Sequence, residues 1–216
     1  MIDESGEWPR VLPLFPLGSV ALPGVGMPLH IFEPRYRALV MTALMADRFF
    51  ASVLIERGSE VGGGDQRANV GTLLRIAHAE ETSDGRWMVV AHGVERIRVL
   101  QWMPDDPFPN GLCEPWPDGE STIQTQSLRE SAVYRMRELL QRQGPETEAQ
   151  MPEFDQDHSL ASFQLLSVAP IGPLDQLTAL QLGNPSERFA LISELLSSEI
   201  SLMDLFAQLE QDDDQE

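Results

Sequence analysis

The sequence of 216 residues contains no lysine; all 15 of its basic residues are arginine. A catalytic Schiff base, a Ser-Lys dyad and a Walker-type phosphate loop all need the amine of lysine at a fixed place. Arginine cannot replace that amine as a base or nucleophile, since its guanidinium stays protonated in proteins. These three kinds of chemistry are therefore excluded.

Cysteine and long apolar runs are scarce as well. Cys113 is the only cysteine, so no disulfide can form within the chain and a reducing compartment is favoured. The N-terminus is acidic and lacks the basic start and apolar run of a signal peptide. No stretch approaches the roughly 18 apolar residues that a bilayer crossing needs. We therefore expect a soluble cytoplasmic protein.

Basic residues are also few. The 15 arginines stand against 34 acidic residues, which gives a formal net charge of −19. Such a chain repels the phosphates of nucleic acids and an anionic membrane surface, so we predict neither as a partner. Residues 1–117 carry 10 arginines and 15 acidic residues, whereas residues 118–216 carry 5 and 19. The acidity therefore belongs mainly to the second half.

The first half of the chain alternates short apolar runs with proline and glycine turns, a pattern typical of β-structure. Predicted strands cover residues 11–15, 27–32, 49–55, 70–82, 86–92, 94–102 and 110–116, with a short helix that starts at Pro34. Six or seven short strands with one small helix suggest a closed or nearly closed barrel.

In the second half, the apolar residues recur at helical spacing. Predicted helices lie around residues 133–140, 160–168 and 174–182, and a long one starts after Asn184 as cap and Pro185 at the first position. We therefore predict an α+β fold, with a β-barrel of about six strands in residues 1–117 and a C-terminal α-helical bundle in residues 118–210. Residues 211–216 are predicted to be an acidic disordered tail.

The positions of the histidines indicate whether they could bind a metal ion together. Asp84-Gly85 predicts a two-residue hairpin turn, because a type I′ turn needs two residues that tolerate positive φ. That register places His78 opposite Ala91 and His92 opposite Ala77, so the two histidines should point to opposite faces of the sheet. No other metal-ligand spacing is present, and we predict no metal site.

Catalytic patterns are equally weak. No Gly-x-Ser-x-Gly nucleophile motif occurs, and Cys113 lies in a strand-like segment that is typical of a small core residue. We predict no catalytic residues and no cofactor. A small carboxylate-dependent hydrolase stays open as an alternative, because the acidic residues are numerous enough to form pairs.

The segment EPRYR is the strongest candidate for a partner-binding site. Glu33, Arg35 and Arg37 gather where a predicted strand gives way to the first helix. One interpretation is an exposed contact patch formed by these three side chains. The other is structural: Glu33 interacts with the helix N-terminus while Arg35 holds a neighbouring strand.

Several segments resemble the Lon N-terminal domain family, the substrate-recognition domain of the Lon protease. The likeness is carried by LPLFPLGSVALPGVGMPLHIFEPRYRALV (residues 12–40), VGTLLRI (residues 70–76), GVERIRVL (residues 93–100) and LDQLTALQLGNPSERFALISELLSSEI (residues 174–200). The resemblance implies a PUA-like β-barrel followed by a helical bundle, in the stand-alone bacterial form of the domain. Proteolytic and ATP-dependent activities are not implied, because the chain has no lysine from which either site could be built.

The resemblance and the missing catalytic patterns together favour a non-enzymatic module that binds polypeptide segments such as those of unfolded or damaged proteins. Such a function predicts an exposed apolar groove on the barrel or at its junction with the helices. RNA binding by a PUA-like barrel is a further alternative, which the negative charge opposes. The sequence leaves the partner and the oligomeric state open.

Overall fold

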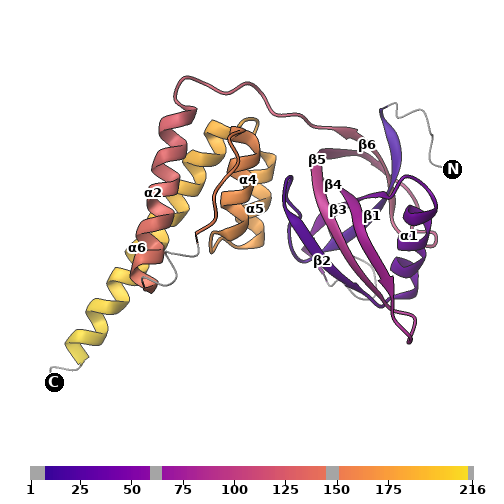
Figure 1. Cartoon of the computed structure of the whole chain (residues 1–216), viewed down its shortest axis with the longest axis horizontal. Helices are drawn as coiled ribbons and strands as arrows, with labels where there is room; N and C mark the ends of the chain where they lie inside the picture. Colours follow the sequence, from indigo (N-terminus) through magenta and orange to yellow (C-terminus); the bar gives the residue numbers. More distant parts are fainter. Residues whose placement is uncertain (1–7, 59–64, 145–150, 214–216) are drawn as a thin grey trace. The chain divides into compact units, whose positions relative to one another are not determined.

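The computed structural model describes residues 8–58, 65–144 and 151–213 (Figure 1). The chain forms two compact units. One contains residues 1–117 together with 173–181, and the other contains residues 118–172 and 182–216. We call them the barrel unit and the helical unit.

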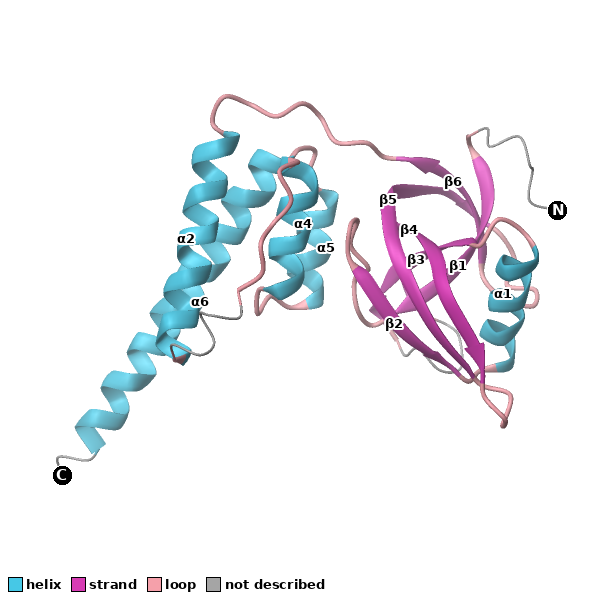
Figure 2. Ribbon diagram, in the orientation of Figure 1, coloured by secondary structure: helices cyan, strands magenta, loops and turns pink. Residues whose placement is uncertain are grey.

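The barrel unit is built on one six-stranded sheet (Figure 2). Its strands are β1 (Arg10–Leu17), β2 (Gly26–Ile31), β3 (Phe49–Arg57), β4 (Gln66–Glu81), β5 (Trp87–Trp102) and β6 (Asn110–Pro115), with helix α1 (Pro34–Met45) between β2 and β3. The strand order is β2-β5-β4-β3-β1-β6, and a second pairing between β5 and β6 closes the ring. The predicted α+β class, with six strands followed by helices, is confirmed.

Strand β5 is 16 residues long and takes part in three pairings, with β2, β4 and β6. Residues 87–92 of this strand pair with β2, and residues 97–102 pair with β6. Between these two parts lies Gly93, whose amide donates to the carbonyl of Val25 at 3.0 Å. A Cβ atom on Gly93 would lie 2.0 Å from the carbonyl oxygen of Leu22, so only glycine lets the loop between β1 and β2 pass so close.

The β4–β5 hairpin differs from the prediction. Its turn is longer than two residues: the amide of Thr82 donates to the carbonyl of Arg86 at 2.8 Å, and Gly85 has φ +77°. A register shift between Ile76 and His78 adds one residue to β4. The longer turn places His78 opposite Val90, and the further shift places His92 opposite Arg75.

The predicted orientation of these histidines is therefore wrong. Val90 and His92 are two residues apart on β5, so His78 and His92 share one face of the sheet. Both side chains are exposed. Even so, within residues 8–58, 65–144 and 151–213 no three His, Cys, Asp or Glu side chains gather as metal ligands.

Helix α5 (Pro173–Gln181) belongs to the barrel unit, whereas the prediction assigned this segment to the helical bundle. Leu177 is buried against Leu54 and Ala68 of the barrel. The buried Arg96 of β5 donates from Nη1 to the carbonyl of Leu180 at 2.7 Å. These contacts fix α5 to the barrel, and helical periodicity alone could not reveal them.

The helical unit contains α2 (Thr125–Gln143), α4 (His158–Val168) and α6 (Pro185–Asp213). The predicted cap of the last helix is confirmed, because Asn184 Oδ1 accepts from the amide of Glu187 at 3.1 Å. Helix α6 continues to Asp213, so the first three residues of the predicted disordered tail are helical, and residues 214–216 lie outside the described ranges. None of the helices in the described part of the chain has the length and apolarity to cross a membrane.

One arginine holds the helical unit together. Arg188 is fully buried, and its guanidinium forms a two-pronged ion pair with Asp118, with Nη1 to Oδ1 at 2.9 Å and Nη2 to Oδ2. Its Nε donates to the hydroxyl of Ser162 at 2.8 Å, and the guanidinium carbon lies 4.1 Å from the ring centroid of Phe163. Arg188, in the first turn of α6, thus has a structural role in the helical unit.

Candidate functional site

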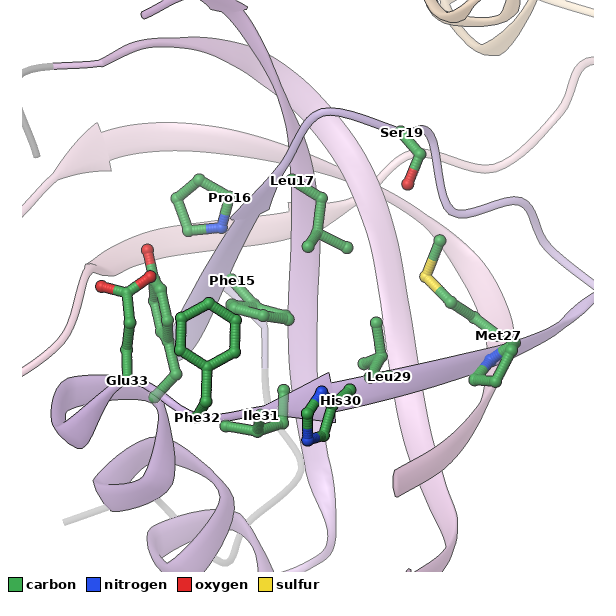
Figure 3. A pocket seen from close by; sticks show the side chains of 12 residues that line it. Phe15, Pro16, Leu17, Ser19, Met27, Leu29, His30, Ile31, Phe32 and Glu33 are labelled. Carbon is green, nitrogen blue, oxygen red and sulfur yellow. The ribbon is translucent and has the colours of Figure 1, made fainter. Parts of the chain in front are cut away.

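A pocket of about 250 Å³ opens between β1 and β2 in the barrel unit (Figure 3). It extends from the connection between these strands to the start of α1. The residues that line it are Phe15, Pro16, Leu17, Ser19, Met27, Pro28, Leu29, His30, Ile31, Phe32, Glu33 and Tyr36. Glu33 of the predicted site lines this pocket.

The pocket exists because β1 and β2 follow one another in sequence without pairing. Among the described strands, β2 pairs only with β5, and residues 14–17 of β1 pair with β3. Strand β1 carries Pro13 and Pro16, and β2 carries Pro28; Pro16 and Pro28 line the pocket. Proline lacks an N–H donor, so neither Pro16 nor Pro28 can donate a hydrogen bond across the gap between the two strands.

Apolar side chains form the floor of the pocket. Phe15, Leu29, Ile31 and Tyr36 are buried in one core cluster, and the rings of Phe15 and Tyr36 meet edge-to-face with centroids 4.4 Å apart. Phe32 lines the same pocket, yet 52% of it is exposed. A large exposed aromatic at the mouth of a pocket with an apolar floor is typical of a binding site rather than of core packing.

The polar end of the pocket is formed at the start of α1. Arg35 Nε donates to Glu33 Oε2 at 3.0 Å, and the Arg35 guanidinium carbon lies 4.4 Å from the centroid of the Tyr36 ring. Glu33 is the N-cap residue of α1 but makes no capping hydrogen bond with its side chain. Burial raises the pKa of Tyr36 to about 12, so its hydroxyl is neutral at physiological pH. The pocket thus combines an apolar floor with one ion pair at its end.

The third predicted residue lies elsewhere. A Cβ atom on Gly85 would come within 3.0 Å of Arg37 Nη2, which places the Arg37 side chain against the β4–β5 turn. The structure therefore brings Glu33 and Arg35 together and separates Arg37 from them. Sequence reasoning missed the rest of the pocket, although Pro16 and Pro28 within apolar runs were a usable signal for open strand edges.

Carboxylates gather at a second, more open cavity lined by residues of β4 and β5. Arg67 donates to Asp65 at 2.6 Å and to Asp105 at 2.6 Å, and its guanidinium lies 5.1 Å from the Trp102 ring. Hydrogen bonding to Arg67 holds the pKa of Asp65 below its usual value. Both carboxylates are therefore engaged by one cation, an arrangement that stabilises structure and leaves no proton-sharing acid pair between them.

Cys113 is confirmed as a core residue. Its side chain is fully buried in β6, and burial raises the pKa of the thiol to about 12. A thiol that stays protonated at physiological pH is a poor nucleophile.

The chain belongs to a known family. A family model described as the ATP-dependent protease La (LON) substrate-binding domain matches residues 11–198. The mixed barrel and helices seen here are the fold of that family.

Relatives and solved structures agree with this assignment. The chain is 26% identical to Lon protease 2 of Herpetosiphon aurantiacus, over 95% of this chain and 26% of that protein. It is also 26% identical to a LON peptidase N-terminal domain and RING finger protein of Schizosaccharomyces pombe, over 88% of this chain and 46% of that protein. The chain thus spans from about a quarter to less than half of these relatives.

Among solved structures, a Lon N-terminal domain protein from Xanthomonas campestris aligns with a TM-score of 0.61 and 28% identity, over 87% of this chain and 97% of that one. The N-terminal domain of the Mycobacterium avium complex Lon protease aligns with a TM-score of 0.66 and 15% identity, over 87% and 98% of the two chains. The second likeness concerns the fold alone.

Proposed function

We propose that this protein is a non-enzymatic recognition module that binds polypeptide segments through the pocket between β1 and β2. The observation that carries the proposal is Phe32, a half-exposed aromatic at the mouth of a pocket with a buried apolar floor. The description of the family as a substrate-binding domain supports it. The single buried cysteine is compatible with a cytoplasmic setting, where thiols stay reduced.

The size of the pocket favours a side chain over a cofactor. Pockets for drug-sized molecules and cofactors hold about 300–1,000 Å³, and this one holds about 250 Å³. One large apolar side chain of a partner fits that space. Because such side chains are buried in folded proteins, unfolded segments are the partners that expose them.

The two strand edges also indicate how a partner is bound. A segment that joined β2 as a further strand would find no N–H donor at Pro28, and none at Pro16 on the facing strand. We therefore propose that recognition occurs through a side chain in the pocket rather than through strand addition. The formal charge of −19 supports a polypeptide over a nucleic acid as partner.

The test is binding of a permanently unfolded model protein, reduced and alkylated α-lactalbumin, measured by fluorescence anisotropy. Phe32→Ala should weaken binding about tenfold, which corresponds to about 1.4 kcal/mol. Tyr134→Ala is the matched control, since Tyr134 is 63% exposed on α2 and lies outside the pocket. Equal affinities for the two variants, or no binding by the unaltered protein, would contradict the proposal.

A further inference from the structure

The C-terminal part of α6 carries a row of large apolar side chains that its own unit leaves uncovered. Leu202, Leu205, Phe206 and Leu209 are 49–61% exposed. They follow the spacing i, i+3, i+4, i+7, which places them on one face of the helix. We call these four residues the α6 stripe.

The stripe differs from the face that α6 uses inside the helical unit. Phe189, Ile192, Leu196 and Ile200 are buried, and at 100° per residue the centre of this set lies about 135° from the centre of the stripe. Upstream, Leu191 and Leu195 fall on the line of the stripe and are partly buried. Helix α6 therefore has two apolar faces, and one of them is open.

The spacing of the open face indicates the shape of its occupant. Positions 191, 195, 198, 202, 205 and 209 alternate in steps of four and three, the 3.5-residue repeat by which one helix packs along another. Ser198 is the only polar residue in this series. An amphipathic helix is the element that fits such a seam.

The charge around the stripe indicates the chemistry of that helix. Residues 194–216 contain eight acidic residues and no basic one. On the described part of α6, Glu194 and Glu199 flank the line of the stripe, each about 70° from its centre at 100° per residue. Asp204 instead lies on the far side of the helix, where Arg142 Nε donates to Asp204 Oδ1 at 2.8 Å. A second α6 packed along this one, in either direction, would bring a further acidic segment that has no basic residue of its own, so self-pairing is opposed.

We propose that the α6 stripe is a docking surface for a basic amphipathic helix of another protein. The apolar seam of the partner would cover the four stripe residues, and its flanking Lys or Arg side chains would meet the acids of α6. This surface lies on the helical unit and does not depend on the pocket of the barrel unit.

The test uses the full chain and three helical peptides of equal length, measured by fluorescence anisotropy. The first has a Leu seam with Lys and Arg flanks, the second the same seam with Glu flanks, and the third the basic flanks with a Gln seam. The proposal predicts that the first binds at least tenfold more tightly than the other two, and that raising the salt concentration weakens it.

The matched variants are Leu205→Gln/Phe206→Gln and, as control, Tyr134→Gln, which is exposed on α2. The double variant should lose at least tenfold in affinity for the first peptide, whereas the control and Phe32→Ala should keep it. Equal binding of the acidic and basic peptides would overturn the proposal. So would a dimer in sedimentation analysis that the double variant abolishes, because the occupant would then be a second copy.

Discussion

Replacing Arg188 by methionine should selectively destabilise the helical unit. Arg188 is fully buried and binds Asp118 through two nitrogens, while Asp118 keeps a side-chain exposure of 14%. Methionine keeps much of the apolar stem but leaves the carboxylate without its cation. Removing one partner of a buried ion pair costs about 3–5 kcal/mol, and the residual exposure of Asp118 places the expected loss near 3 kcal/mol.

The size of this effect can be measured by urea-induced unfolding. With an m-value of about 1.5–2 kcal/mol per molar, a loss of about 3 kcal/mol moves the unfolding midpoint down by about 1.5–2 M. Because small domains have total stabilities of about 5–15 kcal/mol, this is a large share of what the unit has.

Two spectroscopic signals can follow the unfolding of the two units separately. All four tryptophans lie in the barrel unit, at positions 8, 87, 102 and 116. Tryptophan fluorescence therefore follows the barrel, whereas circular dichroism at 222 nm is dominated by the helices. In Arg188→Met the helical transition should move to lower urea, and the tryptophan transition should stay near its original midpoint.

The matched control is Arg142→Met, which removes an ion pair with Asp204 on the exposed surface. Such pairs are screened by water and contribute little, so this variant should unfold like the original protein. A helical midpoint that moves by less than 0.5 M in Arg188→Met would refute the reasoning about the buried pair. A tryptophan transition that moves equally would refute the assignment of separate cores.

Two further predictions concern the barrel unit. Gly93→Ala should destabilise the barrel by about 1–3 kcal/mol or more, measured in the tryptophan transition, because its Cβ would lie 2.0 Å from the carbonyl oxygen of Leu22. Gly172→Ala is the control, since no atom lies within 4 Å of a Cβ there. Similar unfolding midpoints for the two variants would contradict the close approach at Gly93. Cys113 should react with a thiol reagent at pH 9 only after unfolding, because burial raises the pKa of its thiol from 9.0 to about 12. Since the folded pKa exceeds the unfolded one, the thiol contributes stability that is complete below pH 9 and is lost as the pH rises toward 12. Rapid labelling of the folded protein at pH 9 would be inconsistent with this burial.

The elements of the fold could be predicted because local signals determine them. Alternating apolar residues and proline or glycine turns located the strands, and Asn184-Pro185 located the start of α6. The register of β4 and β5 could not be predicted in the same way. The turn between them is one residue longer than Asp84-Gly85 indicates, and this difference alone places His78 opposite Val90 and so on the same face as His92.

The placement of α5 and the shape of the pocket depend on tertiary contacts. Nothing in the sequence of α5 states that Leu177 packs on the barrel rather than on the neighbouring helices. The proximity of Glu33 and Arg35 was predictable from their spacing, whereas the separation of Arg37 depends on where the β4–β5 turn lies. Tertiary topology also decides that β1 and β2 stay unpaired, although their prolines restrict the choice.

Because charge is unevenly distributed along the chain, the salt dependence of binding distinguishes the two proposed surfaces. Residues 1–117 carry 10 arginines against 15 acids, and 11 of the 12 residues that line the pocket bear no carboxylate or guanidinium. Binding there depends on apolar burial, which moderate salt leaves nearly unchanged. The α6 stripe lies in a stretch with eight acids and no cation, so binding there should fall as salt screens the charges. Binding that survives salt and requires Phe32 therefore belongs to the pocket, and binding that salt abolishes and that requires Phe206 belongs to the stripe.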